Sequence, residues 1–207
     1  SQIAVVDVDG CENVSVENCR FNMKRMGSHE VRMTNTKNVT VKNCLFVYGF
    51  SALWLRRCSG RVLVENNTFA YLGINAAAIG CLPDAEVVIR RNIFYNTCAK
   101  FKNCPAVTVA KDVRKLICDE NLYWKTPNRS PNMRFLGLSD QNGAAWCRAM
   151  YKEAGKRIAA DLDEAHGKFD LESNGSFSDP LFVDPENHDF RLKIASPAKK
   201  RGWRPIK

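Results

Sequence analysis

One pattern of alternating apolar and polar residues recurs along the first 125 residues and constrains the fold more than any other feature. Its clearest copy is residues 39–46, VTVKNCLF, and successive copies begin 23 to 29 residues apart. Repetition at this period predicts a solenoid, in which each unit buries its apolar face only by stacking on the next unit. The alternation within each copy has a period of two, which predicts strands rather than helices. The copies span residues 14–21, 39–46, 62–69, 87–94 and 116–123.

These copies predict an all-β fold, a parallel solenoid of about five coils over residues 1–127. A second apolar alternation follows each copy, so each coil is expected to hold at least two strands. The aromatic residue that ends each copy is expected to join an internal stack, and the Asn or Cys two places before it is expected to join a turn ladder. The two columns are Phe21, Phe46, Phe69, Phe94, Tyr123 and Cys19, Cys44, Asn67, Asn92, Asn121.

Residues 128–207 lack the repeat and are expected to complete the same single domain. An amphipathic helix is predicted over residues 146–154, followed by a loop-rich tail over residues 179–202. The chain begins inside a predicted strand, so we expect the first coil to be incomplete at its N-terminal side. An uncapped stack would expose unpaired strand edges, so the apolar residues of the tail are expected to cover the open end of the solenoid. These residues are Leu181, Phe182, Phe190 and Leu192.

The charge and the cysteines limit the possible partners. A formal net charge of +9 favours a polyanionic partner. No apolar run is long enough to span a bilayer. The nine cysteines lack the paired spacing of zinc sites, so no metal site is predicted. Either they are small buried thiols, or Cys19 and Cys44 form a disulfide between adjacent coils, and the sequence leaves both open.

The repeat and the tail together resemble a known family. The coil sequence NVTVKNCLF is similar to right-handed parallel β-helix proteins of the pectate-lyase-like superfamily. The tail DPLFVDPENHDFRLKIASPAKKRG is similar to the C-terminal segment of secreted bacterial β-helix glycoside hydrolases. The resemblance implies a polysaccharide substrate and an extracellular or periplasmic location. The chain has neither the Gly-His-Gly of polygalacturonases nor the calcium-binding aspartate cluster of pectate lyases.

The candidate site occupies the outward positions of the second strands, which stacking places side by side. One column begins Asp7, Arg32, Trp54, and its neighbour includes Asp9 and Arg56. Paired carboxylates supply the acid and the base for glycoside cleavage, tryptophan faces stack on sugar rings, and arginine grips carboxylate or sulfate groups. We therefore predict Asp7 and Asp9 as catalytic and the other three residues as substrate-binding. A structural interpretation, in which Asp7 and Arg32 only pair and Trp54 only packs, stays open.

Neighbouring residues extend this prediction. His29 and Glu30, at the edge of the face, are predicted to be catalytic, as an imidazole beside a carboxylate. Tyr48 and Tyr71 occupy equivalent places, so they form either a sugar platform or a packing column. The other residues predicted to bind substrate are Arg57 and Asn75.

Three functions are compatible with this face. The first is a glycoside hydrolase that acts on an acidic or sulfated polysaccharide without a cofactor. The second is a polysaccharide lyase, in which Arg56 or His29 removes the proton beside a uronate and a cation such as Ca2+ neutralises its carboxylate. The third is a non-catalytic glycan-binding or structural β-helix. The basic doublets at 56–57 and 90–91 lack interleaved aromatic residues, so no nucleic-acid partner is expected.

Overall fold

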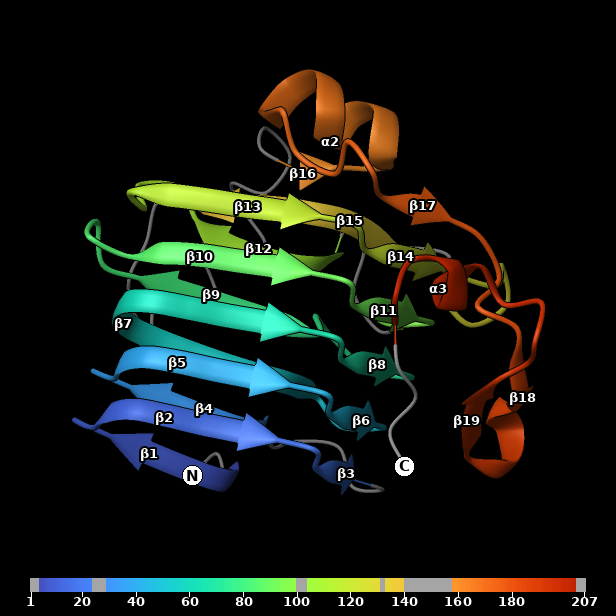
Figure 1. Ribbon diagram of the computed structural model, residues 1–207, viewed down its shortest axis with the longest axis horizontal. Helices are drawn as coiled ribbons and strands as arrows, with labels where there is room; N and C mark the ends of the chain where they lie inside the picture. The colour runs from blue at the N-terminus through green and yellow to red at the C-terminus, as the bar shows by residue number, and fades with distance from the viewer. Residues whose placement is uncertain (1–3, 24–28, 100–103, 131–132, 140–157, 204–207) are drawn as a thin grey trace.

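The computed structural model describes residues 4–23, 29–99, 104–130, 133–139 and 158–203. Figure 1 shows strands stacked in parallel, from the blue N-terminal coil at the bottom to the yellow-green strands near the top. Adjacent strands pair in parallel register from coil to coil. This arrangement confirms the predicted fold class, an all-β solenoid of about five coils.

Three walls, named A, B and C, run along the stack, and β7 (Ser51–Glu65) turns the corner between walls A and B. Wall A also contains β1 (Ala4–Asp9), β4 (His29–Thr34), β9 (Ala77–Cys81), β12 (Cys104–Ala110) and β15 (Met133–Ser139). Wall B also contains β2 (Glu12–Glu17), β5 (Lys37–Lys42), β10 (Glu86–Arg90) and β13 (Lys115–Asp119). Wall C contains β3 (Arg20–Asn22), β6 (Leu45–Val47), β8 (Thr68–Ala70), β11 (Ile93–Tyr95), β14 (Leu122–Trp124) and β17 (Ser176–Phe177).

The predicted internal aromatic stack is confirmed. From Phe21 to Tyr123, the ring centroids of consecutive members lie 4.9 to 5.3 Å apart, and all the rings stack face to face. Phe135 of β15 continues the stack 4.4 Å from Tyr123. The stack therefore extends past the boundary expected at residue 127, because β15 pairs with β12 and adds a further strand to wall A.

The predicted turn ladder is also confirmed. The side-chain Oδ1 of Asn67 accepts the backbone N–H of Cys44 at 2.9 Å, and Asn92 and Asn121 repeat this contact one coil further on. All three asparagines are fully buried, so the ladder satisfies turn amides that water cannot reach. The residue before each rung has positive φ, a conformation that asparagine tolerates. These turn residues are Asn18, Asn43, Asn66, Arg91 and Glu120.

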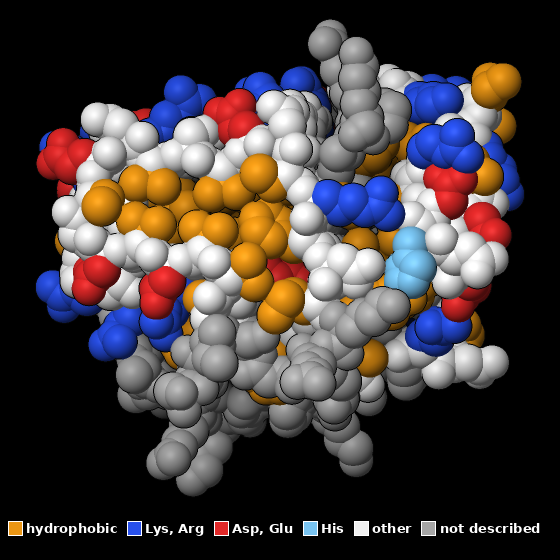
Figure 2. Space-filling model, turned by 90° about the horizontal axis from the view of Figure 1, so that it is seen from below, with side chains coloured by type: hydrophobic (Ala, Val, Ile, Leu, Met, Phe, Trp, Pro, Cys, Tyr) orange, Lys and Arg blue, Asp and Glu red, His pale blue; other side chains and the backbone are white. Residues whose placement is uncertain are grey.

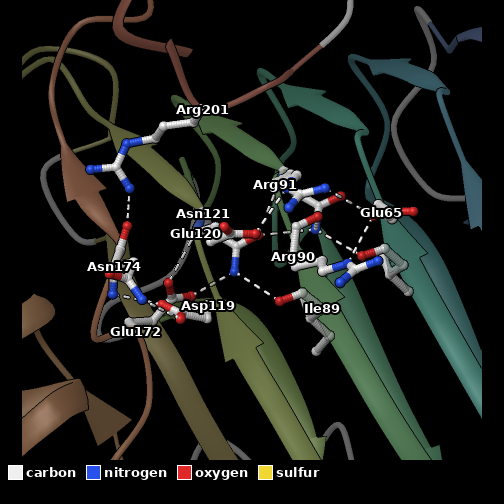
Figure 3. A network of polar contacts seen from close by, with 12 residues as sticks. Glu65, Ile89, Arg90, Arg91, Asp119, Glu120, Asn121, Glu172, Asn174 and Arg201 are labelled. Atoms are coloured by element: carbon white, nitrogen blue, oxygen red, sulfur yellow. Dashed lines mark hydrogen bonds and ion pairs between the residues drawn. The ribbon is translucent and has the colours of Figure 1, made fainter. Parts of the chain in front are cut away.

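Glu172 ends the ladder (Figure 3). Its Oε1 accepts hydrogen bonds from the Tyr123 hydroxyl at 2.6 Å, the Asn121 side-chain amide at 2.7 Å and the Cys118 thiol at 3.1 Å. Its Oε2 accepts the backbone N–H of Asn121 at 3.4 Å. Glu172 thus takes the place that the next asparagine rung would occupy.

The outward column of wall B, which reads Glu17, Lys42, Glu65, Arg90, Asp119, alternates in charge. Lys42 Nζ and Arg90 Nε lie 3.2 and 2.8 Å from the two carboxylate oxygens of Glu65. Burial acts to raise the pKa of Glu65, but the two cations together lower it. Glu65, Arg90 and Arg91 appear together in Figure 3. Each charge therefore has a neighbour of opposite sign, which disfavours register slips between coils.

The tail does not cover the end of the solenoid, which corrects the prediction. Phe182 of β18 (Phe182–Asp184) and the apolar residues of β19 (Asp189–Leu192) pack on the outward face of wall C. Figure 1 shows this hairpin beside the stack, with α3 (Pro197–Lys200) above it. The reason is that wall C presents apolar side chains outward, and these need a cover. They include Leu45, Val47, Ala70, Ile93 and Leu122.

Other C-terminal elements lie over the last coil. Strand β16 (Ile158–Ala159) pairs antiparallel with β15, and α2 (Leu162–Phe169) follows it at the top of Figure 1. The short 3-10 helix η2 (Pro185–Asn187) joins β18 to β19. The helix predicted over residues 146–154 lies outside the described residues.

The N-terminal end of the stack is less covered. Seen from below in Figure 2, apolar side chains cross its centre and charged side chains border them. Val6, Val8 and Val14 of the first coil are only partly buried. Among the described strands, β1 pairs only with β4 and β2 only with β5, so one edge of each stays open.

The eight cysteines in the described ranges are free thiols, and six of them are buried. Cys19 and Cys44 lie on neighbouring coils without a bond between them. Of the two interpretations that the sequence left open, the structure shows stacked thiols in the core.

Candidate functional site

Parallel pairing in wall A brings the first predicted column together. Asp7 lies opposite Arg32, and Arg32 lies opposite Trp54. The Arg32 guanidinium donates two parallel hydrogen bonds to the Asp7 carboxylate, with Nε 2.8 Å from Oδ1. This hydrogen-bonded fork lowers the pKa of Asp7, which is therefore ionised at neutral pH. The pair remains accessible, because 47% of the Asp7 side chain and 32% of the Arg32 side chain are exposed.

Trp54 and His29 contact each other next to this pair. Their ring centroids are 4.0 Å apart in an edge-on arrangement, and Trp54 is half-buried against Ala78. His29 was expected at the surface but is buried. Burial, with a contribution from the Arg32 charge, lowers the pKa of His29 to about 4, so its imidazole is neutral at neutral pH.

Glu30 is also buried, which corrects its expected place at the rim. Neither of its carboxyl oxygens has a hydrogen-bond partner among the described residues. Burial raises the pKa of Glu30 to about 9, so the group keeps its proton at neutral pH. Gly49 makes room for it, because a Cβ at that position would lie 2.8 Å from Glu30 Oε1.

Asp7 and Glu30 therefore carry different charges on neighbouring strands of one wall. Asp7 is held ionised by a cation, and Glu30 is held neutral by desolvation. Environments that separate two carboxyl pKa values in this way are typical of an acid and a base that work together. The arrangement can give a proton at one group and accept a proton at the other.

The second predicted column is linked through a neighbouring turn. Asp9 Oδ1 accepts a hydrogen bond from Asn35 Nδ2 at 2.9 Å, and Asn35 Oδ1 accepts one from Arg57 Nε at 3.0 Å. Arg56 lies opposite Thr34, which lies opposite Asp9. Within the described part of the chain, Arg56 Nε is buried without a hydrogen bond. Asp9, Arg56 and Arg57 thus lie on the same side of the stack as the Asp7–Arg32 pair.

Asn35 is a contributor that the sequence analysis missed. It follows β4 with a φ of 50°, at the turn where Gly10 has a φ of 67° and Arg57 a φ of 53°. The signal was available, because this turn recurs with the coil and favours glycine or asparagine. Its side chain can position both Asp9 and Arg57.

Tyr48 and Tyr71 do not join this site. Their rings stack 5.3 Å apart, but they pack on the cluster between wall C and the tail. His188 lies edge-on to Tyr48 at 5.2 Å, and the Tyr71 hydroxyl is 2.9 Å from Glu186. The tail therefore occupies the surface that a sugar would need, and the packing interpretation describes their position.

Asn75 does not face the site either. Its side chain is buried, where Oδ1 accepts a hydrogen bond from Ser51 Oγ at 3.1 Å. Ser51 in turn lies opposite His29 in the strand register. Asn75 precedes β9 and its side chain is buried, so it is not available to a chain bound on the exposed face of wall A.

Within the described ranges, no group of three or more His, Cys, Asp or Glu side chains is arranged to hold a metal ion. No helix in the part of the chain that the structure describes is long and apolar enough to cross a membrane.

Comparison with known proteins identifies the family through the coils. No curated protein and no solved structure matches the chain. The family model described as "right handed beta helix region" matches residues 4–113, which are more than half of the 207 residues. The matched residues contain the first strands of all three walls. They also contain the outward column of wall A that runs from Asp7 to Thr108. The chain therefore belongs to the right-handed β-helix family.

Proposed function

We propose that this protein is a glycoside hydrolase that cleaves an acidic or sulfated polysaccharide along wall A. One observation carries the proposal: the pKa of Asp7 is lowered and the pKa of Glu30 is raised, on adjacent strands of one wall. Glycoside hydrolysis needs one carboxyl that gives a proton and one that accepts a proton. Membership of the β-helix family fits a carbohydrate-active protein and supports this choice.

The surroundings of the two carboxyls suit an anionic sugar chain. Trp54 offers part of an aromatic face on which a sugar ring can stack. Arg56 and Arg57 lie along the same wall and can contact carboxylate or sulfate groups. The net charge of +9 attracts such a polymer before it binds.

The reaction would use the two protonation states directly. Glu30 donates its proton to the glycosidic oxygen as the bond from that oxygen to the anomeric carbon breaks. Asp7 accepts a proton from a water molecule whose oxygen bonds to the anomeric carbon. One water is consumed in each turnover, and a proton then returns from Asp7 to Glu30 through solvent.

Burial of Glu30 adds a requirement to this mechanism. Its carboxyl is fully buried, so substrate binding must open a path to it. Trp54, which contacts the neighbouring His29, is the side chain whose displacement would begin such an opening. The free energy of stacking a sugar on Trp54 would then offset the cost of exposing Glu30.

A lyase is the second candidate, and the His29 environment favours it. A neutral imidazole can remove the proton beside a uronate carboxylate, and the pKa of His29 near 4 keeps it neutral. Elimination creates an unsaturated uronate that absorbs ultraviolet light, whereas hydrolysis creates only new reducing ends.

The test is a cleavage assay on a panel of uronate-containing and sulfated polysaccharides, with both readouts in the same reaction. We expect reducing ends without ultraviolet absorbance. Asp7→Asn and Glu30→Gln should each lower the rate at least about a hundredfold, as expected when a general acid or base is removed. Glu86→Gln is the matched control, because Glu86 is a partly exposed carboxylate of wall B that pairs with Arg114.

The outcomes separate the candidates. Ultraviolet absorbance that depends on His29 would select the lyase. Retention of the protein on a polysaccharide column with no product of either kind would select glycan binding alone. Cleavage that persists in both carboxyl variants would rule out the proposed acid and base.

A further inference from the structure

A cleft lies between wall C and the tail. It has a volume of about 270 Å3 and is lined by Arg20, Leu45 and Thr68 of wall C and by the segment from Asn187 to Arg191 together with Trp203. The cleft exists because the tail covers wall C at two separate places. The β18–β19 hairpin packs near the Tyr48–Tyr71 column, and Trp203, which lines the cleft, packs in the same apolar cluster.

Several polar atoms of this cleft have no partner among the described residues. Thr68 Oγ1, Trp203 Nε1 and His188 Nδ1 are all buried without a hydrogen bond. Thr68 lies between two apolar strand neighbours, Leu45 and Ile93, on the outward face of wall C. A buried hydroxyl and a buried indole N–H cost stability unless something bonds to them. Their presence in one cleft points to a polar occupant.

The mouth of the cleft is positively charged. Arg20 donates a hydrogen bond from Nη2 to the backbone oxygen of His188 at 2.8 Å, which places its guanidinium at the tail. Asp189 pairs with Arg191, and this hydrogen bond, with a further contribution from the charge of Arg20, lowers the pKa of Asp189 to about 2. Two guanidinium groups thus lie near one carboxylate, so these three side chains together carry a net positive charge that an anionic ligand can neutralise.

We propose that this cleft binds a single sugar unit that carries a carboxylate or sulfate group. The volume lies just under the roughly 300 Å3 at which pockets for drug-sized ligands begin, so it suits one ring rather than a chain. The anionic group would contact Arg20 and Arg191. Ring hydroxyls would bond to Thr68, His188 and the Trp203 indole once these side chains turn toward the cleft, because the three polar atoms are closed to solvent in the structure. The choice of a sugar over other small anions rests on the proposed function, whereas the anion site rests on the cleft alone.

The experiment measures binding of single sugars by calorimetry to the full chain. The probes are glucuronate, galacturonate, a sulfated N-acetylglucosamine, neutral glucose and inorganic sulfate. These probes have no glycosidic bond to cleave, so the result is independent of hydrolysis on wall A. We expect at least one acidic sugar to bind, and to bind at least about tenfold more tightly than glucose, the equivalent of one good charged contact.

The variants locate the site. Arg20→Gln should weaken binding about tenfold. Thr68→Val should weaken it severalfold while the protein stays folded, because the hydroxyl makes no hydrogen bond within the described ranges that the variant would lose. Arg114→Gln is the control, since Arg114 is an exposed arginine of the turn before β13 that pairs with Glu86. Thermal unfolding of each variant checks that the fold is retained.

Each result decides the proposal. If the sulfated sugar binds and the uronates do not, or the reverse, the anionic group is identified. Binding of inorganic sulfate as tight as that of the acidic sugars would overturn the sugar and leave an anion site. The proposal is wrong if no acidic sugar binds, or if Arg20→Gln and Thr68→Val bind as the unchanged protein does. Binding that survives while wall A proves inactive would support the cleft and reject only the hydrolase.

Discussion

Two buried glutamates at opposite ends of the stack have raised pKa values but different surroundings. Glu172, next to the last coil, receives hydrogen bonds from Tyr123, Asn121 and Cys118. Glu30, in the second coil, receives none at either oxygen from any residue that the structure describes. Burial is the main cause of the raised pKa in both cases. The Glu172 carboxyl completes the asparagine ladder, whereas no hydrogen bond from a described residue offsets the cost of burying the Glu30 carboxyl.

The difference teaches how to separate a structural carboxyl from a functional one in this fold. A satisfied buried acid stabilises the protein, and its loss leaves several donors unpaired. An unsatisfied buried acid costs stability, so it needs another reason to be there. The position of Glu30 beside the Asp7–Arg32 pair and Trp54 offers that reason in the proposed hydrolase.

The largest expected change in the free energy of unfolding comes from Glu172, the buried carboxyl that is fully hydrogen-bonded. Glu172→Ala should lower the free energy of unfolding by about 4 kcal/mol, because it leaves buried donors of Tyr123 and Asn121 unpaired and opens a cavity. Urea unfolding measures this change. Glu172→Gln keeps one acceptor oxygen and should cost less than half as much. Equal effects of the two variants would mean that the ladder does not end on this carboxyl.

The next effect is the pH dependence that Glu30 imposes. The folded protein holds the Glu30 proton up to about pH 9, whereas the unfolded chain releases it at the ordinary value near 4.5. Its contribution to stability is therefore complete below the unfolded pKa and is lost as the pH rises toward the folded pKa. Between about pH 6 and 8, the unchanged protein should lose about 3 kcal/mol relative to Glu30→Gln.

Unfolding by urea at several pH values checks this prediction. The comparison with Glu30→Gln isolates one group, since all other titrating groups are shared. A constant difference between the two proteins across this range would show that Glu30 is already ionised in the folded state.

A smaller change in stability distinguishes the asparagine rungs of the ladder from its cysteine rungs. Asn92→Ala should cost about 2–3 kcal/mol, because the buried N–H of Asn67 loses its acceptor. Cys44→Ala should cost only about 1 kcal/mol, since the thiol mainly fills space and bonds weakly to backbone oxygens. Calorimetric unfolding of both variants tests whether amide rungs matter more than thiol rungs. A reversed order would contradict the ladder as a source of stability.

The smallest effect is expected at the exposed rim of the first coil. Lys37 Nζ is 3.8 Å from Glu12 Oε1, and both side chains are more than half exposed. Lys37→Ala should change stability by less than about 0.5 kcal/mol. Lys42→Ala, which removes a cation 3.2 Å from the buried Glu65 carboxylate, should cost about 1 kcal/mol at low salt.

Much of the fold and part of the site followed from spacing alone. The lateral pairing of Asp7 with Arg32 and of Arg32 with Trp54 was predictable, because parallel strands in register make residues one coil apart into neighbours. The burial of His29 and Glu30 was not predictable, since the coil repeat gives lateral neighbours but not what covers a strand. Tyr48 and Tyr71 were misplaced for the same reason, because the tail that covers them comes from far along the chain.

The sequence by itself determined the coil, its aromatic stack and its asparagine ladder, because these depend on a local period of two repeated at a nearly constant interval. Only the tertiary structure decided where the non-repeating residues meet the coils. Glu172 reaches Asn121 across 51 residues, and the tail packs along wall C instead of over an end. Such contacts depend on which exposed apolar surfaces and unpaired polar groups remain after the coils have stacked, and no periodicity encodes them.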